Sequence, residues 1–344
     1  MSNDHLSNEI SISGQLTETG IKAGAKSRAL SSVDRLLGGL IDLANAPIEN
    51  IAKRSRARGD ADVELIREAG KLRLQHLHAD PEVAAQIFEQ HLKQVGRRHE
   101  NKSAVVQAAI EDLRTQPPSD QQSSTGPEVL DDAFMNRFER YAEDATTDQL
   151  RERWGRVLAS EIRTPGTFSG KVMRVVDELE PKTAALFEAA CTHRIGNTLV
   201  KCLTGELPFD VVERLVTAGL LFDPGLGQVR RCVTIKDAKG QEVALFQFGI
   251  SALSLPKNTE IPRAKAGDIA PIATEKSGPA IPVYVLTDAG VAISSILEHS
   301  EVDVVERLCA RISEYLTLTP VQQLVAIGSN YHIARIWTDA GSKE

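Results

Sequence analysis

The fold of the central part of this chain is decided by residues 146–169, TTDQLRERWGRVLASEIRTPGTFS. Apolar residues recur there at helical spacing, so one face of a helix carries Leu150, Trp154, Val157, Leu158 and Ile162. Thr146, with Gln149 three positions later, predicts the start of this helix as a capping box. Pro165 and Gly166 predict its end. We therefore expect a helix that buries Trp154.

Helices are also expected on both sides of this stretch. Upstream, Asp80, Pro81 and Glu82 predict a helix start, because an N-cap acid, a proline at the first position and an acid in the first turn all favour one. Residues 82–114 would then form one helix about 50 Å long at a rise of 1.5 Å per residue. Aromatic residues make up only 4 % of the chain, which favours helices over an all-β fold.

The apolar stripe of residues 82–114 is interrupted at residues 96–102, GRRHENK. His99 and Lys102 stand where the apolar face should continue. One interpretation ends a helix at Gly96 and starts another near Asn101, with a solvated turn between them. A second is a buried polar layer that fixes helix register. A third is a recognition surface for phosphate or an acidic partner, formed by Arg97, Arg98, His99 and Lys102.

Beyond residue 196 the pattern changes from helices to short strands. Residues 208–220 predict a helix, and residues 229–235 and 242–250 alternate like two strands around a turn at 237–240. Residues 284–286 predict a third strand, and Thr287 would cap the next helix. This order is typical of a winged-helix module. The tail predicts a helix capped by Ser300 and a hairpin of residues 324–327 and 331–337.

Residues 115–127, TQPPSDQQSSTGP, are dominated by Pro, Gln and Ser, which indicates a linker and a domain boundary. The chain is therefore expected to be mainly α with a smaller α+β part, in which helical N-terminal and central blocks precede a winged-helix-like module. The expected parts are a flexible N-terminus (1–28), a long-helix domain (29–114), the linker, a helical central domain (128–195), a winged-helix-like module (196–300) with an inserted loop (255–282), and a C-terminal helix and hairpin (301–344).

Composition points to an ordinary globular protein, with 42 % hydrophobic and 25 % charged residues among 344. The four cysteines are widely spaced, without a C-x-x-C pair, which predicts free buried thiols in a reducing cytoplasm. The N-terminus shows no basic segment followed by an apolar core, so no secretory signal is expected. Residues 315–334 are uncharged, but their polar residues make membrane spanning an unfavourable interpretation.

Motifs for catalysis or cofactors fail on their spacing. Residues 166–171, GTFSGK, imitate a phosphate loop but have three residues between the glycines instead of four, and they follow a helix. Ser254 and Lys257 match S-x-x-K, but the intervening proline forbids the helix that this motif needs. His76 and His78 fall on different faces of a helix and cannot share a metal ion. We therefore expect no catalytic residue, no metal site and no cofactor.

Charge argues against nucleic-acid binding by the winged-helix-like module. Residues 180–300 contain 12 Lys and Arg against 13 Asp and Glu, and the chain carries a net charge of -7. The expected helix at 208–220 would present Asp210 and Glu213, with Arg214 as its only cation. The candidates for phosphate contacts are a basic run and a pair on the wing: Lys53, Arg54, Arg56, Arg58, Arg230 and Arg231.

Three segments of the chain resemble a known bacterial family. These are residues 45–62, NAPIENIAKRSRARGDAD, residues 97–113, RRHENKSAVVQAAIEDL, and the run from residue 131 to residue 191. The most specific phrase is WGRVLASEIRTPGTFS, with Trp154, Glu161, Pro165 and Ser169. Over residues 35–320 the chain is similar to the domain of unknown function 2806 (DUF2806). It also resembles, more distantly, abortive-infection alpha-type proteins, which implies a role in phage defence.

The expected function is that of a non-enzymatic cytoplasmic protein that acts through protein contacts, as a scaffold or sensor, with a protein partner or a second copy. Two alternatives remain open. The first is a winged-helix protein that binds nucleic acid. The second is a membrane-acting abortive-infection toxin, or an enzyme whose site is assembled from residues distant in the sequence.

Overall fold

The computed structural model describes residues 23–37, 81–237, 239–264, 267–276, 278–317, 319–328, 330–338 and 341–343. The chain divides into two compact units, residues 1–173 and 174–344. We call the first the helical unit and the second the sheet unit, because helices dominate the N-terminal half and strands lie in the C-terminal part.

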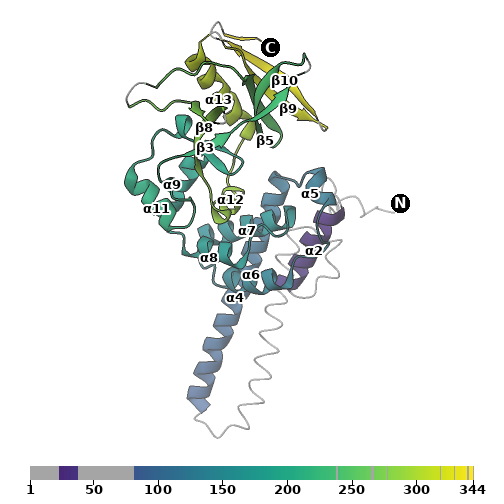
Figure 1. Ribbon diagram of the computed structural model, residues 1–344. Coiled ribbons are helices and arrows are strands. Elements are labelled where there is room, and N and C mark those ends of the chain that lie inside the picture. Colours follow the sequence, from purple (N-terminus) through teal and green to yellow (C-terminus); the bar gives the residue numbers. More distant parts are fainter. Residues whose placement is uncertain are drawn as a thin grey trace, which may run out of the picture. The chain divides into compact units, whose positions relative to one another are not determined.

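The helical unit is built around one long helix (Figure 1). Its described elements are α2 (Ala23–Leu37), α4 (Pro81–Thr115), α5 (Asp120–Ser124), α6 (Asp132–Glu143) and α7 (Asp148–Arg163), and α8 (Gly170–Glu178) crosses into the sheet unit. α7 packs along α4, and α2 contacts α4, α5 and α7. The single helix expected over residues 82–114 is confirmed, and it continues through Gly96.

Trp154 lies at the centre of this packing, as the sequence predicts. Its side chain is 1 % exposed, and its ring meets Phe138 edge to face at 5.9 Å and stacks on Tyr141 at 4.6 Å. The next residue, Gly155, allows α7 to approach α4 closely. A Cβ built on Gly155 would lie 2.5 Å from the Ala108 Cβ, a distance that real Cβ atoms essentially never show.

The start of α7 differs by one residue from the expected one. Thr147, not Thr146, is the N-cap, and its hydroxyl accepts a hydrogen bond from the Leu150 amide at 3.2 Å. The expected flexible N-terminus also ends earlier than residue 28, because α2 begins at Ala23. Arg28 is fully buried in this helix. Its side chain therefore belongs to the interior of the helical unit.

The segment expected to be a linker, residues 115–127, lies within the helical unit and contains α5. Arg28 holds it in place. The Arg28 guanidinium donates to the carbonyl oxygens of Gln122 at 2.8 Å, Pro127 at 2.9 Å and Thr125 at 3.2 Å, and also to Ile162 at 2.7 Å. The boundary between the two units falls instead at residues 173/174. Composition alone does not reveal that a distant arginine satisfies these carbonyl groups.

The sheet unit contains two antiparallel sheets, one with the order β1-β2-β8-β3 and β7 paired to β8, the other with the order β11-β10-β9-β6-β5-β4. The strands are β1 (Arg194–Ile195), β2 (Thr198–Val200), β3 (Gln228–Arg231), β4 (Val233–Lys236), β5 (Glu242–Phe248), β6 (Ser251–Pro256), β7 (Ala273–Glu275), β8 (Gly278–Val285), β9 (Val321–Ile327), β10 (Asn330–Thr338) and β11 (Gly341–Lys343). The helices are α9 (Pro181–Cys191), α10 (Lys201–Thr204), α11 (Phe209–Thr217), α12 (Asp288–Ser294) and α13 (Glu301–Leu316).

The winged-helix interpretation is not confirmed. The hairpin around residues 237–240 is present as β4 and β5, but β3 pairs with β8 in the other sheet. The expected first wing strand, residues 229–235, is therefore divided at Cys232 between two sheets. The expected inserted loop, residues 255–282, contains the end of β6, β7 and the start of β8. Short alternating runs predict strands but do not specify which strands pair.

The apolar core of the sheet unit is formed by α13, by one face of the six-stranded sheet and by residues of β1, β2 and β8 in the other sheet. Ala244, Phe246 and Phe248 of β5 point into this core, while Val243 and Leu245 alternate to the other face. The Ser300 cap of α13, the Thr287 cap of α12 and the C-terminal hairpin of β9 and β10 are confirmed.

Candidate functional site

The polar interruption in the long helix joins three helices of the helical unit. Asn101 is buried, donates from Nδ2 to the Glu143 carbonyl at 2.7 Å and accepts from Arg151 Nη2 at 2.8 Å. Lys102 Nζ lies 2.8 Å from Glu139 Oε1 and 3.4 Å from Glu143 Oε1. The interpretation as a solvated turn is wrong, because α4 does not break. A buried polar contact is present at Asn101, whereas Lys102 is half-buried, and a role in fixing helix register stays a prediction.

The remaining basic residues of this segment are more accessible. Arg97 is exposed, His99 is half-buried, and Arg98 lies 3.8 Å from Glu143. Lys102 and Arg98 are both paired with acids of α6, whereas Arg97 is exposed on the described helix α4. A recognition surface at this position stays a prediction.

The loop that imitates a phosphate loop binds a carboxylate of its own chain. Glu161, which is 2 % exposed, accepts from the Gly166 amide at 2.6 Å and from the Phe168 amide at 2.9 Å. Gly166 has φ +89°, a backbone conformation that favours glycine. Burial raises the pKa of Glu161, and the amide hydrogen bonds oppose this shift. The amides that a phosphate would need are thus occupied by Glu161.

The wing arginines are not equivalent. Arg230 is engaged within the sheet unit, where Nη2 donates to the Gln247 carbonyl at 2.5 Å and the guanidinium lies 4.8 Å from the centre of the Phe248 ring. Arg231 is exposed. The structure therefore leaves one of these two arginines for a phosphate contact. Lys53, Arg54, Arg56 and Arg58 lie outside the described residues.

The described cysteines carry thiols whose pKa is raised by burial. Cys191 and Cys309 are buried, whereas Cys202 and Cys232 are half-buried, so the expectation of four buried thiols holds for two of them. Burial raises the pKa of Cys191 to about 12 and that of Cys202 to about 11. A thiol in this state is a poor nucleophile.

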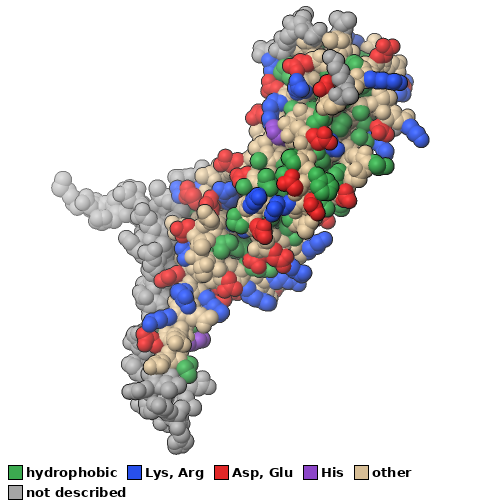
Figure 2. Space-filling view, turned by 90° about the vertical axis from the view of Figure 1, so that its left-hand side faces the viewer, with side chains coloured by type: hydrophobic (Ala, Val, Ile, Leu, Met, Phe, Trp, Pro, Cys, Tyr) green, Lys and Arg blue, Asp and Glu red, His purple; other side chains and the backbone are tan. Residues whose placement is uncertain are grey.

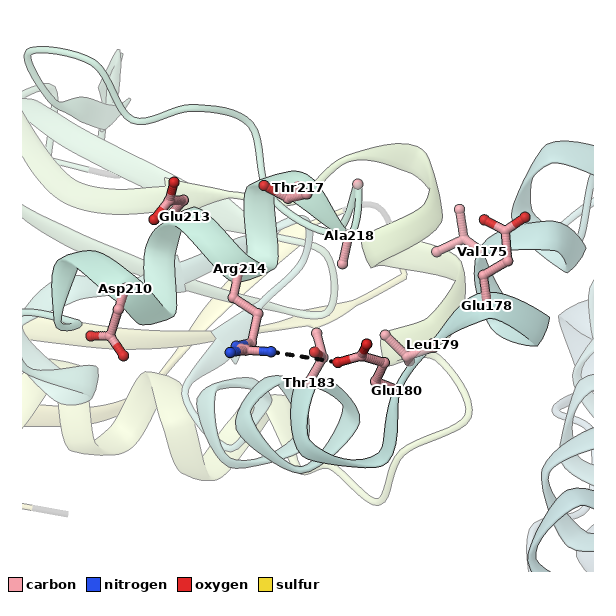
Figure 3. A pocket seen from close by; sticks show the side chains of 11 residues that line it. Val175, Glu178, Leu179, Glu180, Thr183, Asp210, Glu213, Arg214, Thr217 and Ala218 are labelled. Atoms are coloured by element: carbon pink, nitrogen blue, oxygen red, sulfur yellow. Dashed lines mark hydrogen bonds and ion pairs between the residues drawn. The ribbon is translucent and has the colours of Figure 1, made fainter.

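An open pocket of about 630 Å³ lies within the sheet unit and is lined by the end of α8, the start of α9 and one side of α11 (Figure 3). Half-buried Val175, Leu179 and Ala218 contribute apolar surface. Four carboxylates also line the pocket, from Glu178, Glu180, Asp210 and Glu213.

Arg214 is the only cation among the described residues that line this pocket. It extends from α11 toward α9, and its Nη1 lies 3.5 Å from Glu180 Oε2 (Figure 3). The pocket thus has an excess of negative charge. The sequence indicated the acidic character of α11 but not that Glu178 and Glu180 lie beside it, because the approach of α9 to α11 is a tertiary contact.

Phe209 begins α11 and is 82 % exposed.

In the described part of the chain no group of three or more His, Cys, Asp or Glu side chains could hold a metal ion. None of the described helices combines the length and the apolar character that crossing a membrane requires.

Residues 93–203 match the model of a family described as "Protein of unknown function (DUF2806)". No curated protein and no solved structure matches the chain. The resemblance to abortive-infection proteins gains no support from these comparisons. The matched residues run from α4 to α10 and include Trp154, Glu161, Pro165 and Ser169. The resemblance expected over residues 35–320 is confirmed over residues 93–203, which are similar to this family.

Proposed function

We propose that this chain is a non-enzymatic protein that acts through protein contacts, and that the acidic pocket between α9 and α11 receives a basic side chain of its partner. The observation that carries the proposal is the composition of the pocket, which is lined by four carboxylates and one arginine. A lysine or arginine side chain suits it, because the aliphatic stem can cover the apolar surface while the charged end meets the carboxylates.

The charge distribution supports a protein partner over nucleic acid. Asp210 and Glu213 are both exposed on α11 and would repel phosphate groups. Figure 2 shows Lys and Arg side chains interspersed with Asp and Glu over the visible face of the molecule, whereas nucleic-acid binding favours a basic patch. Phe209 adds an exposed aromatic side chain on α11, of the kind enriched at protein interfaces. Winged-helix nucleic-acid binding, a cytoplasmic location and a role in phage defence stay predictions.

The test measures binding of labelled synthetic peptides by fluorescence anisotropy. A peptide with several Lys and Arg residues should bind, and Glu213→Lys should weaken that binding at least about tenfold, since a loss of about 1.4 kcal/mol corresponds to this factor. Glu298→Lys changes the net charge equally at an exposed position outside the pocket and is the matched control.

Duplex DNA provides the opposing measurement. We expect its association near physiological salt to be no tighter than roughly micromolar, the weak end of non-specific binding. Basic peptides that bind both lysine variants equally would refute the pocket as their site. Tight DNA binding that Arg231→Ala abolishes would favour the nucleic-acid alternative instead.

A further inference from the structure

Arg214 places a cation of the chain itself inside the acidic pocket. Its side chain is 39 % exposed, and its Nη1 lies 3.5 Å from Oε2 of Glu180, whose side chain is 72 % exposed. Among the four carboxylates drawn in Figure 3, Glu180 is the one that an ion pair joins to another drawn residue. The pocket therefore already holds one guanidinium group, bound to one of its carboxylates.

The pair between Arg214 and Glu180 is weak. Its single contact of 3.5 Å is longer than the roughly 2.7–2.9 Å of a good charge-assisted hydrogen bond, and exposed ion pairs contribute little to stability. Glu180 is also the N-cap of α9, but its side chain accepts no capping hydrogen bond from this helix. Another cation can therefore bind the Glu180 carboxylate at little cost to the fold.

Arg214 has a second acid beside it on its own helix. Asp210 precedes Arg214 by four residues in α11, so the two side chains project from the same face. Figure 3 shows both on the same side of this helix. An acid four residues before a base is the favourable order for an ion pair along a helix. Arg214 can thus leave Glu180 without losing a carboxylate as its neighbour.

We propose that the basic side chain of the partner is an arginine, that it displaces Arg214 from Glu180, and that Arg214 then pairs with Asp210. This rests on the proposed function, in which the pocket receives a basic side chain. Arginine suits the exchange better than lysine, because its planar guanidinium can donate two parallel hydrogen bonds to one carboxylate, whereas the lysine ammonium acts as a point charge. The incoming pair is then stronger than the single contact that it replaces.

Two synthetic peptides test the choice of side chain. They share one sequence, except that one carries arginine and the other lysine at every basic position, and fluorescence anisotropy measures their binding. We expect the arginine peptide to bind at least about fivefold more tightly. Glu180→Gln removes the carboxylate at which the exchange takes place and should abolish this preference. Glu213→Gln is the matched control, because it removes the same charge from the pocket and should weaken both peptides alike.

Arg214→Gln tests the displacement. Glutamine removes the competing cation, so the arginine peptide should bind this variant at least about fivefold more tightly than the unchanged chain. Arg231→Gln, at an exposed position outside the pocket, changes the net charge equally and should have a much smaller effect. The transfer to Asp210 predicts a coupling: Asp210→Asn should weaken binding more when Arg214 is present than in Arg214→Gln.

The outcomes separate this inference from the proposed function. None of the substituted side chains is buried, so each variant should keep its fold. If Glu213→Lys weakens both peptides but the arginine preference is absent or does not depend on Glu180, the pocket binds cations and the exchange is wrong. Arg214→Gln that fails to tighten binding, or a missing coupling with Asp210, would also overturn the exchange. Peptides that bind Glu213→Lys as tightly as the unchanged chain would instead refute the proposed function.

Discussion

The two units differ in which side chains they bury and which they expose. The helical unit buries charged side chains: Arg28 and Glu161 are almost fully enclosed. In the described part of the sheet unit the buried polar residues are uncharged, and this unit holds most of the large apolar side chains that are exposed, although Ile87 and Val129 of the helical unit are exposed too. The exposed side chains of the sheet unit include Phe209, Phe222, Leu226, Val233, Ile235 and Ile333.

This difference separates residues that stabilise the fold from residues available for contacts. A buried charge is retained only with partners, and both Arg28 and Glu161 have their partners inside the helical unit. A largely exposed apolar side chain contributes little to folding and becomes buried when a partner covers it. The phrase around Trp154 and Glu161 therefore belongs to the interior of the helical unit, and the acidic pocket proposed for contacts lies in the sheet unit.

The largest expected effect is that of Trp154→Ala. Removing this side chain empties a site between Phe138 and Tyr141, and such a change typically lowers the free energy of unfolding by about 3–5 kcal/mol. Chemical denaturation measures it. Arg156→Ala, in the same helix and in a partly exposed ion pair with Glu152, is the control and should change stability by less than about 1 kcal/mol. Equal effects would mean that Trp154 does not hold the interior together.

Arg28→Ala should destabilise the helical unit by about 3 kcal/mol, because buried carbonyl groups would lose their donor. Residues 115–127 should then become the first site of limited proteolysis, whereas they resist cleavage in the unchanged chain. The control is Arg35→Ala, on the same helix as Arg28. It removes a surface ion pair between Arg35 and Asp132 of α6. Cleavage at 115–127 that is equally fast without the substitution would show that Arg28 does not hold this segment.

The sequence predicts the elements that depend on local signals. The periodic apolar residues around Trp154, the caps at Thr287 and Ser300 and the C-terminal hairpin are all present, because spacing and capping act within a few residues. The apparent linker was predicted from composition alone. Its carbonyl groups are satisfied by Arg28, which is about 100 residues away in the sequence, and no local signal announces such a contact.

The candidate site was only partly visible in the sequence for the same reason. Asp210 and Glu213 could be recognised as acidic positions on a helix, but the pocket exists because α9 brings Glu180 toward Arg214. The sequence also does not reveal that the chain passes from one sheet to the other at Cys232, between β3 and β4. Strand patterns predict that residues 229–235 are extended, but pairing is decided by packing against α13 and β8.

Gly155→Ala should have a smaller effect than the loss of Trp154 or Arg28. The added Cβ would lie 2.5 Å from Ala108 Cβ and 2.9 Å from the Ala109 amide nitrogen, so α7 would have to move away from α4. Overpacking of this kind typically lowers stability by about 1–3 kcal/mol. Thermal unfolding measures it. Gly96→Ala is the matched control, because a Cβ there meets no atom within 4 Å, and alanine should stabilise that helix slightly. A stabilising Gly155→Ala would show that the two helices are not in close contact.

The smallest expected effect, about 1–2 kcal/mol at neutral pH, is that of Glu161→Gln, which keeps one acceptor but turns an amide group toward the second backbone donor.

The pH dependence of the Glu161→Gln effect is more informative than its size. Burial raises the pKa of Glu161 above the ordinary value of 4.5, so the native carboxyl takes up its proton at a higher pH than the unfolded one. Above the pKa of Glu161 in the folded protein, ionisation of this carboxyl lowers the free energy of unfolding. This loss of stability disappears as the pH falls from that pKa toward 4.5. Because the other carboxyl groups titrate in both proteins, the difference in unfolding free energy between the unchanged chain and Glu161→Gln isolates this residue, and it should widen on acidification. A difference that narrows would show that the amide hydrogen bonds, and not burial, dominate the environment of Glu161.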